Sequence, residues 1–251
     1  MIGLVLSGGG ARGFAHMGVI KFLNEMGARV HHFSGTSSGA IVAAFIAAGY
    51  SPDECMRIFK EEKMLRKLRT TRRAGFFKMD GLTSFYIKYL PQNTFESLTT
   101  KLTISATNII NGTTVYFSEG ELIMPLMAAS SVPVVFRPVH YRNYIMLDGG
   151  LLNNLPVEPL LVDKLPIVGV HVNPVGEIAE FPNTLRVMER CFNLAVYTNV
   201  VARKQLCDVV IEPPELRKFS VNQYSKADEI FLIGYEYAKS RKKDLQYILA
   251  K

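Results

Sequence analysis

The pentapeptide Gly35-Thr36-Ser37-Ser38-Gly39 matches the pattern G-x-S-x-G, whose central serine is a candidate nucleophile. Residues 30–34 can form a strand before it, and apolar residues 40–48 predict a helix after it. A serine on such a sharp turn presents its hydroxyl at a helix N-terminus, where developing negative charge is favoured. The flanking Gly35 and Gly39 leave room for the turn. Turns of small residues that only pack a helix on a sheet share this pattern, so the assignment of Ser37 needs a base nearby.

A serine hydroxyl needs a proton acceptor, which is usually a histidine. The five histidines are His16, His31, His32, His140 and His171, and none lies in a strand-end loop suited to presenting a base. Asp148 is better placed, because it follows the apolar stretch 144–147 and precedes Gly149 and Gly150. Aspartate has a pKa of about 3.9 in water, and partial burial raises it toward neutrality. Asp148 is therefore the candidate base.

The segment Gly8-Gly9-Gly10-Ala11-Arg12-Gly13 follows a predicted strand and precedes a predicted helix, so it satisfies G-x-G-x-x-G. A dinucleotide site of this type also needs an acidic residue at the end of the second strand. That strand ends at Ser34-Gly35, and no Asp or Glu lies between Met26 and Tyr50. Consecutive glycines can instead bring backbone N–H groups against the oxyanion of an acyl-transfer intermediate. A tight turn without any ligand is the remaining alternative.

The predicted elements place these motifs on an α/β scaffold. Strands are predicted at 2–7, 30–34, 144–147, 167–172 and 209–211, with a hairpin over 101–110 and 113–117. Helices are predicted at 14–26, 40–48, 121–130, 185–206 and 227–249, and a capping box at 51–54 starts another. This order predicts a mainly parallel sheet with helices on its faces. With 251 residues, 48% of them hydrophobic, the chain is expected to form a single domain over 1–251.

Together, the glycine segment, the Ser37 pentapeptide and Asp148-Gly149-Gly150 resemble the patatin-like phospholipase family, in its compact bacterial branch. Two further segments look similar to the family, Ala129-Ser130-Ser131-Val132-Pro133 and Asn154-Leu155-Pro156-Val157. The motif-bearing part covers about residues 2–172, and three motifs in order are far more specific than any one of them.

The resemblance implies a three-layer α/β/α sandwich and a serine acyl hydrolase that cleaves lipid esters without a metal or a cofactor. It assigns Ser37 as nucleophile and Asp148 as base in a dyad that needs no histidine. It assigns the backbone N–H groups of Gly9, Gly10 and Ala11 to the oxyanion hole. The family pattern gives supporting roles to Gly8, Arg12, Gly13, Gly35, Gly39 and Gly149, with Arg12 holding the loop or anions at the site.

The net charge of +7 indicates an anionic partner. From Lys60 to Lys78 there are eight basic and two acidic residues, interleaved with apolar ones. Such a segment can lie on an anionic membrane surface, cover the site as a lid, or be an ordinary solvated helix. The three widely spaced cysteines and the lack of an export signal predict a cytoplasmic protein, at most peripheral at the inner membrane surface.

Three other functions remain open from the sequence. An acyltransferase would use the same serine but pass the acyl group to an acceptor other than water. A regulatory scaffold would keep the fold with weak or no catalysis. Nucleic-acid binding has the least support, because the basic stretch contains no recognisable reading motif, and no nucleic-acid partner is expected. The headgroup, the acyl chain and the oligomeric state are not given by the sequence.

Overall fold

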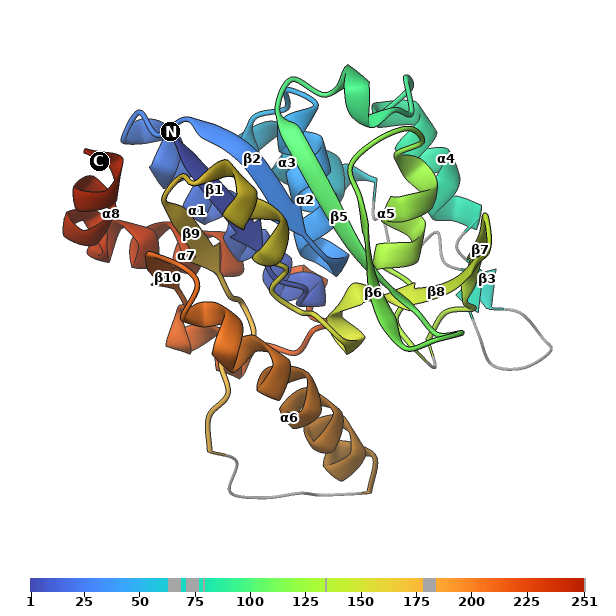
Figure 1. Ribbon diagram of the computed structural model, residues 1–251. Helices are drawn as coiled ribbons and strands as arrows, with labels where there is room; N and C mark the ends of the chain where they lie inside the picture. The colour runs from blue at the N-terminus through green and yellow to red at the C-terminus, as the bar shows by residue number, and fades with distance from the viewer. Residues whose placement is uncertain (63–68, 71–76, 79, 134, 178–183, 251) are drawn as a thin grey trace.

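A computed structural model describes residues 1–62, 69–70, 77–78, 80–133, 135–177 and 184–250. Among these residues, eight strands form one sheet with the order β10-β9-β1-β2-β5-β8-β7, and β6 pairs with β5 (Figure 1). The parallel part comprises β1 (Ile2–Leu6), β2 (Val30–Gly35), β5 (Lys101–Asn108), β9 (Ile167–Val170) and β10 (Val209–Ile211). The prediction of an α/β fold with a largely parallel sheet is confirmed.

The antiparallel part of the sheet begins at β5, which is longer than its neighbours. Strand β6 (Thr113–Phe117) returns beside β5 as the predicted hairpin. Strand β8 (Tyr144–Asp148) pairs with only three residues of β5, Ala106 to Asn108, and β7 (Val139–Tyr141) closes this edge. Gly35 at the end of β2 is level with Ile104, so β5 continues past it toward the residues that pair with β8. The end of β8 is thereby brought to the edge at which β2 ends.

Side chains of β1 alternate between two cores, as expected for a strand that is covered on both faces. Ile2, Leu4 and Leu6 belong to the larger core, while Val5 belongs to a smaller one. Helices α1 (Phe14–Glu25), α2 (Ser37–Ala47), α3 (Pro52–Glu61), α4 (Asp80–Tyr89), α5 (Ile123–Ala129), α7 (Ala227–Ser240) and α8 (Lys242–Leu249) contribute to the larger core. The smaller core is completed by the segment 155–160 and by Val200.

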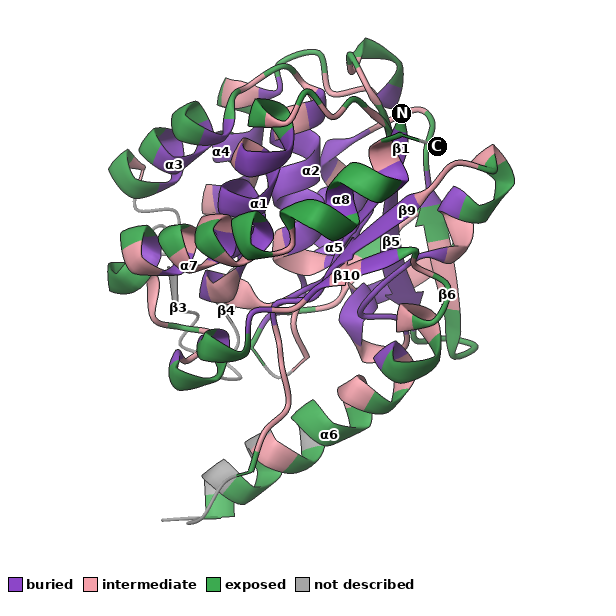
Figure 2. Ribbon diagram, turned by 90° about the vertical axis from the view of Figure 1, so that its left-hand side faces the viewer, coloured by how far each residue is buried: buried purple, intermediate pink, exposed green. Residues whose placement is uncertain are grey.

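Helix α6 (Thr184–Lys204) contrasts with the other helices. Figure 2 shows that it extends away from the body and is exposed over much of its length, whereas strands such as β1 and β9 are buried. Among the α6 side chains that the structure describes, Val200 near the C-terminus belongs to a core. None of the helices in the described ranges is both long and apolar enough to cross a membrane.

Two local predictions need correction. The predicted helix 227–249 is two helices, α7 and α8, with a break at Arg241, whose guanidinium donates to the backbone oxygen of Val210 and to Asp244. These bonds hold Arg241 at the sheet edge, so the chain bends there. Helix α2 begins at Ser37 and not at residue 40, which places the serine in its first turn. The capping box that starts α3 is confirmed, with Ser51 and Glu54 bonded reciprocally.

Candidate functional site

Ser37 lies on a sharp turn between β2 and α2. Its φ angle is +51°, in the left-handed region that a residue with a side chain rarely adopts. A Cβ on Gly39 would lie 2.3 Å from the backbone oxygen of Leu6, and a Cβ on Gly35 would lie 2.9 Å from the backbone nitrogen of Ala40. Both glycines are therefore required by close backbone packing. The turn leaves the Ser37 hydroxyl at the N-terminus of α2, where the helix dipole favours negative charge.

Asp148 is brought to Ser37 by the end of β8. Its carboxylate accepts a hydrogen bond of 2.8 Å from the backbone N–H of Gly150, and the Ser37 hydroxyl lies close enough to influence its pKa. The side chain is buried, and burial raises its pKa to about 6, although the Ser37 hydroxyl and the Gly150 N–H both act in the opposite direction. A Cβ on Gly149 would lie 2.3 Å from the backbone oxygen of Ser105, so glycine is required where the chain turns. The structure thus unites two residues that are more than a hundred positions apart in sequence.

The glycine segment lies against the same turn. A Cβ on Gly8 would be 2.9 Å from Cβ of Ser37, and a Cβ on Gly9 would be 2.5 Å from a methyl group of Val172. Gly10 has a φ of +56°, and a Cβ there would lie 2.4 Å from the backbone oxygen of Val221. Within the described part of the chain, the N–H groups of Gly9 and Gly10 have no backbone or side-chain acceptor.

Ala11 differs from the two glycines before it. Its N–H donates to the backbone oxygen of Val221 over 2.8 Å. An N–H group that is already bonded to a carbonyl does not serve an oxyanion in the same conformation. The prediction of three oxyanion donors therefore narrows to Gly9 and Gly10, and Ala11 anchors the loop.

Arg12 also anchors the loop to the C-terminal part of the chain. Its Nε and Nη2 donate to the backbone oxygen of Phe219 over 2.9 and 2.7 Å, and Nη1 donates to Oδ1 of Asn173 over 3.0 Å. Of the two roles that the sequence left open for Arg12, these bonds favour holding the loop. Gly13 packs tightly against Ser38, because a Cβ on Gly13 would lie 2.7 Å from the Ser38 side chain.

The histidines have other surroundings. His16 is fully buried, with Nε2 2.8 Å from the backbone oxygen of Ser7, and burial lowers its pKa to about 4. His171 is held by Glu212, and burial lowers its pKa as well. His32 contacts Asp163 and Thr103 at the start of β2 and β5, away from the turn. None of these three imidazoles is hydrogen-bonded to Ser37 in the part of the chain that the structure describes.

Three asparagines complete the site and were not assigned from the sequence. Oδ1 of Asn154 lies within 2.6 Å of a Cβ built on Gly8 and 2.7 Å of one built on Gly150, so this buried amide sits between the glycine loop and Asp148. Asn173 donates through Nδ2 to the backbone oxygen of Gly8. Asn199 of α6 accepts the backbone N–H of Asn154 over 3.0 Å. The Asn-Leu-Pro-Val segment was the one sequence signal that pointed to this region.

Metal ligands are not found together in the described part of the chain. The described residues contain no group of three or more His, Cys, Asp or Glu side chains that could hold a metal ion.

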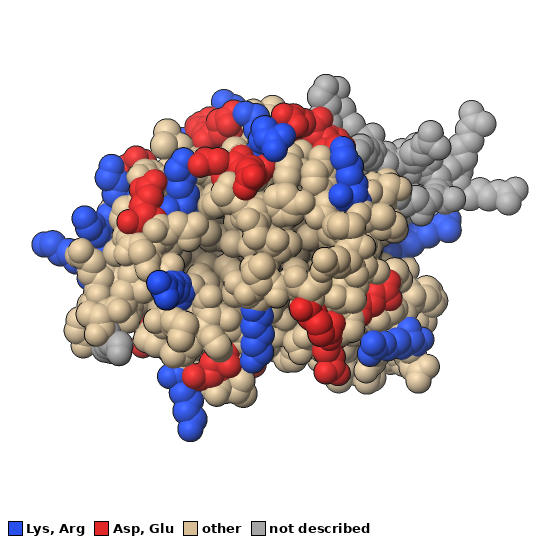
Figure 3. All heavy atoms as spheres, turned by 90° about the horizontal axis from the view of Figure 1, so that it is seen from above, with Lys and Arg blue, Asp and Glu red and all other residues tan. Residues whose placement is uncertain are grey.

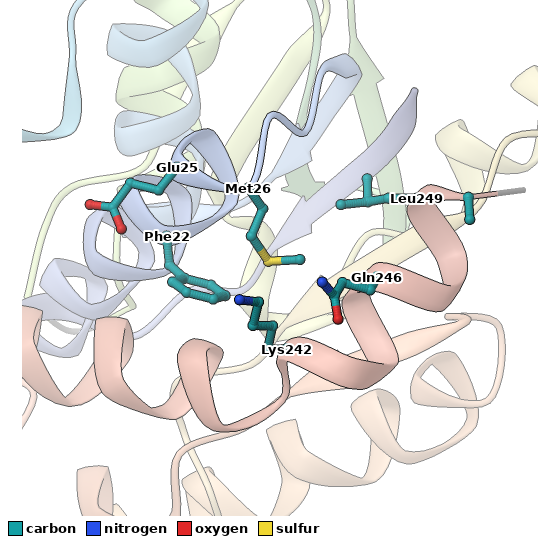
Figure 4. A pocket seen from close by; sticks show the side chains of 7 residues that line it. Phe22, Glu25, Met26, Lys242, Gln246 and Leu249 are labelled. Atoms are coloured by element: carbon teal, nitrogen blue, oxygen red, sulfur yellow. The ribbon is translucent and has the colours of Figure 1, made fainter.

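A surface hollow elsewhere on the molecule is a second candidate for a binding site. It has a volume of about 540 Å³, lies between α1 and α8, and is lined by Phe22, Met26, Lys242 and Gln246 among others (Figure 4). It lies at the C-terminal end of α1, the end far from the glycine loop, and has no serine, threonine or cysteine in its lining.

Charge gives no competing site on the face in Figure 3, where basic and acidic side chains are interspersed around an uncharged centre. A concentrated basic patch, as nucleic-acid binding requires, is not seen on that face.

Comparison with known proteins identifies the same family that the motifs predicted. The sequence model of the family described as patatin-like phospholipase matches residues 4–161, more than half of the chain. The chain belongs to this family. The matched residues include the glycine segment, Ser37 and Asp148, so the predicted resemblance is confirmed.

Two relatives of this patatin-like chain show sequence similarity over nearly its whole length. It is 33% identical to an uncharacterized NTE family protein of Mycobacterium tuberculosis (strain CDC 1551 / Oshkosh), over 95% of this chain and 46% of that protein. It is 25% identical to a lysophospholipase of Scheffersomyces stipitis, over 94% of this chain and 18% of that protein. The chain thus spans about half or less of the length of these relatives.

Solved structures share the patatin fold. VipD from Legionella pneumophila matches with a TM-score of 0.57 and 15% identity, over 98% of this chain and 67% of that one. ExoU, in its complex with SpcU from the type III secretion system of Pseudomonas aeruginosa, matches with a TM-score of 0.51 and 17% identity, over 98% and 52%. At these identities the likeness concerns the fold alone.

Proposed function

We propose that this patatin-like chain is a serine hydrolase that cleaves carboxylic ester bonds of lipids, as a phospholipase A, lysophospholipase or esterase. The observation that carries the proposal is that the Ser37 hydroxyl lies next to the buried Asp148 carboxylate, close enough to influence its pKa, beside the glycine loop that holds the amides of Gly9 and Gly10. A pKa of about 6 leaves Asp148 ionised at neutral pH and yet basic enough to take a proton as attack proceeds. The lysophospholipase relative supports a lipid substrate.

The reaction then follows from the positions of these groups. Oγ of Ser37 attacks the ester carbon while its proton passes to Asp148, and the carbonyl electron pair moves onto oxygen. The N–H groups of Gly9 and Gly10 stabilise that oxyanion. Collapse breaks the bond to the alcohol, which leaves with the proton from Asp148, and the acyl group stays on Ser37. Water then attacks the acyl-enzyme as Asp148 takes its proton, and the fatty acid departs as the proton returns to Ser37.

The supporting residues keep this geometry. Gly8, Gly35, Gly39 and Gly149 allow the close backbone approaches at the turns, and Gly13 allows Ser38 to pack beneath the loop. Arg12 and Ala11 tie the loop to Phe219 and Val221. We propose that the whole chain acts as one catalytic domain in the cytoplasm. The membrane contact expected from Lys60 to Lys78 stays a proposal, because most of that stretch lies outside the described residues.

Replacing Ser37 by alanine tests the proposal. We expect Ser37→Ala to lower turnover of p-nitrophenyl esters and defined phospholipids by a factor on the order of 10⁶, because no nucleophile remains to form the acyl-enzyme. Ser38→Ala is the matched control, since it removes the neighbouring hydroxyl, and it should keep most of the activity. Equal activity of Ser37→Ala and the unmodified chain would refute the assignment. Products formed with and without added alcohol acceptors separate hydrolysis from acyl transfer.

A further inference from the structure

Helix α6 exposes a continuous face without charge. Residues three and four positions apart share one side of a helix, and this side of α6 carries Val187, Cys191, Leu194, Thr198 and Val201. Met188, Ala195 and Ala202 lie beside them, and all eight residues are exposed. We call these eight residues the α6 outer face. Among its larger members, Met188 is 63% exposed and Val201 is 44% exposed, which is unusual for apolar side chains on a regular helix.

Three basic residues of α6 whose side chains the structure describes make contacts away from this face. Arg203 bonds to Glu158 over 2.7 Å, and Lys204 bonds to Glu212 over 2.6 Å. Nearer the tip, Arg190 donates to the backbone oxygen of Gly176 over 2.8 Å. These contacts direct Arg190, Arg203 and Lys204 toward neighbouring segments of the chain, while the α6 outer face is turned toward solvent. That is the reverse of the usual amphipathic arrangement, so the α6 outer face needs an apolar partner to be covered.

The attachment of α6 places the C-terminal part of the helix beside the site. Asn199 bonds to the backbone of Asn154, whose side chain lies against both Gly8 and Gly150. Tyr197, two residues before Asn199 in α6, contacts the ring of His171. The residue after His171, Val172, packs against Gly9. The helix therefore leaves the body next to the glycine loop and projects outward from there (Figure 1).

We propose that the α6 outer face docks on an anionic lipid surface and so holds the dyad at the membrane from which the substrate is taken. This inference rests on the proposed lipid esterase function. Arg203 and Lys204 are paired with carboxylates, so the electrostatic attraction rests on the whole chain, whose net charge is +7. An anionic bilayer attracts a chain of this charge, and the apolar side chains of the α6 outer face enter the headgroup region. A second copy would bring the same positive charge against itself, so the lipid surface is the favoured partner.

Vesicle flotation tests this proposal independently of catalysis when it uses the full chain with Ser37→Ala. The test variant is Val187→Glu/Leu194→Glu. The control is Val162→Glu/Leu232→Glu, which makes the same chemical changes at exposed positions away from α6. With phosphatidylcholine vesicles that contain phosphatidylglycerol, we expect the test variant to bind about tenfold or more weakly than the control, because two charges enter the apolar layer. Equal binding of the two variants, or no binding of the parent chain, would overturn the proposal.

Cys191 provides a second measurement within the same face. It is exposed, whereas Cys55 is buried and burial raises the pKa of the partly buried Cys207 to about 12, so a thiol-reactive, polarity-sensitive fluorophore should label Cys191 first. We expect its emission to rise when anionic vesicles are added. A rise with protein concentration alone, abolished by Val187→Glu/Leu194→Glu, would instead identify a second copy as the partner and overturn the lipid assignment.

The catalytic readout separates this inference from the proposed function. In the chain that retains Ser37, Val187→Glu/Leu194→Glu should hydrolyse a soluble short-chain ester within about twofold of the control, while hydrolysis of vesicle lipid falls about tenfold. Loss of both activities alike would overturn the docking role. If the parent chain hydrolyses no ester, the proposed function fails, and flotation still decides whether the face binds lipid.

Discussion

Two aspartates at opposite edges of the same sheet have opposite electrostatic surroundings. Asp148, at the edge where β2 ends, lies next to the neutral Ser37 hydroxyl and accepts a hydrogen bond from the N–H of Gly150. Asp163, at the edge where β2 and β5 begin, contacts Nδ1 of His32 over 2.6 Å and Nζ of Lys101 over 3.3 Å. Burial raises the pKa of Asp148 to about 6. Burial acts in the same direction on Asp163, but its contacts with His32 and Lys101 outweigh it and lower the pKa.

The difference shows how one residue type serves two purposes. A carboxylate next to a cationic partner is stabilised as an anion and becomes a poor base, which suits a structural contact. A buried carboxylate without a cation keeps a high proton affinity and can exchange protons near neutral pH. The edge with Asp148 also has the strained Ser37 backbone and the tightly packed glycines, features that cost stability and that in proteins generally cluster at functional sites, which supports the proposed role.

Among variants outside the Ser37–Asp148 pair, the largest expected loss of activity comes from a substitution in the glycine loop. Gly10→Ala should lower ester hydrolysis by about 10² to 10³, because its Cβ would meet the Val221 backbone oxygen and shift an oxyanion donor. Gly27→Ala is the matched control at the far end of α1, since Gly27 also has a positive φ, of +74°, but no atom within 4 Å of its Cβ position. Steady-state kinetics of both variants check this. Similar activity losses in the two would mean that backbone strain, and not the site, is responsible.

The second effect is on stability and should depend on pH. The folded-state pKa of Asp148 lies above its unfolded value, so its contribution to stability is fully present below about pH 4 and is lost as pH rises through 6. Asp148→Asn removes this dependence. We therefore expect the variant to be more stable than the parent by about 2–3 kcal/mol at pH 8, with little difference near pH 4. Urea denaturation at both pH values measures this, and a destabilised variant at pH 8 would contradict the account of Asp148.

The smallest effect belongs to the other edge. Asp163→Asn should lower stability by about 1 kcal/mol at pH 7, because a neutral amide loses the attraction to Lys101 and forms a weaker bond with His32. Its contribution, unlike that of Asp148, should disappear as pH falls, because the pKa is lowered in the folded state. Ester hydrolysis should stay within about twofold of the parent. A large loss of activity in Asp163→Asn would break the division of roles between the two edges.

Much of the scaffold could be predicted because local signals agreed with the fold. The apolar run before Gly8 forms β1, the Asn-Gly turn joins β5 to β6, and Ser51 caps α3 as its spacing required. The motif pairing of Ser37 with Asp148 also followed from residue types, since a serine nucleophile requires a base. In these cases the signal lay within a few residues or in a chemical necessity.

The features that could not be predicted from the sequence depend on contacts between residues far apart in the chain. Ala11 was expected to face the oxyanion, but its N–H is bonded to Val221, a partner distant in the chain. The break at Arg241 depends on the backbone oxygen of Val210, which helical periodicity cannot reveal. The place of Asn154 between the loop and Asp148 likewise depends on how separate segments pack. The exposed side of α6 has an apolar pattern that, in sequence, is the same as that of a buried helix.

The rate at which a fluorophosphonate probe labels Ser37, measured across pH, tests most directly whether Asp148 is the base. For the parent chain the rate should be constant above pH 7 and fall about tenfold per pH unit below the inflection near 6, where Asp148 becomes protonated. In Asp148→Asn the rate should drop by a factor on the order of 10⁴ and lose that inflection. If Asp148→Asn is labelled as fast as the parent, or keeps the same inflection, another group activates Ser37.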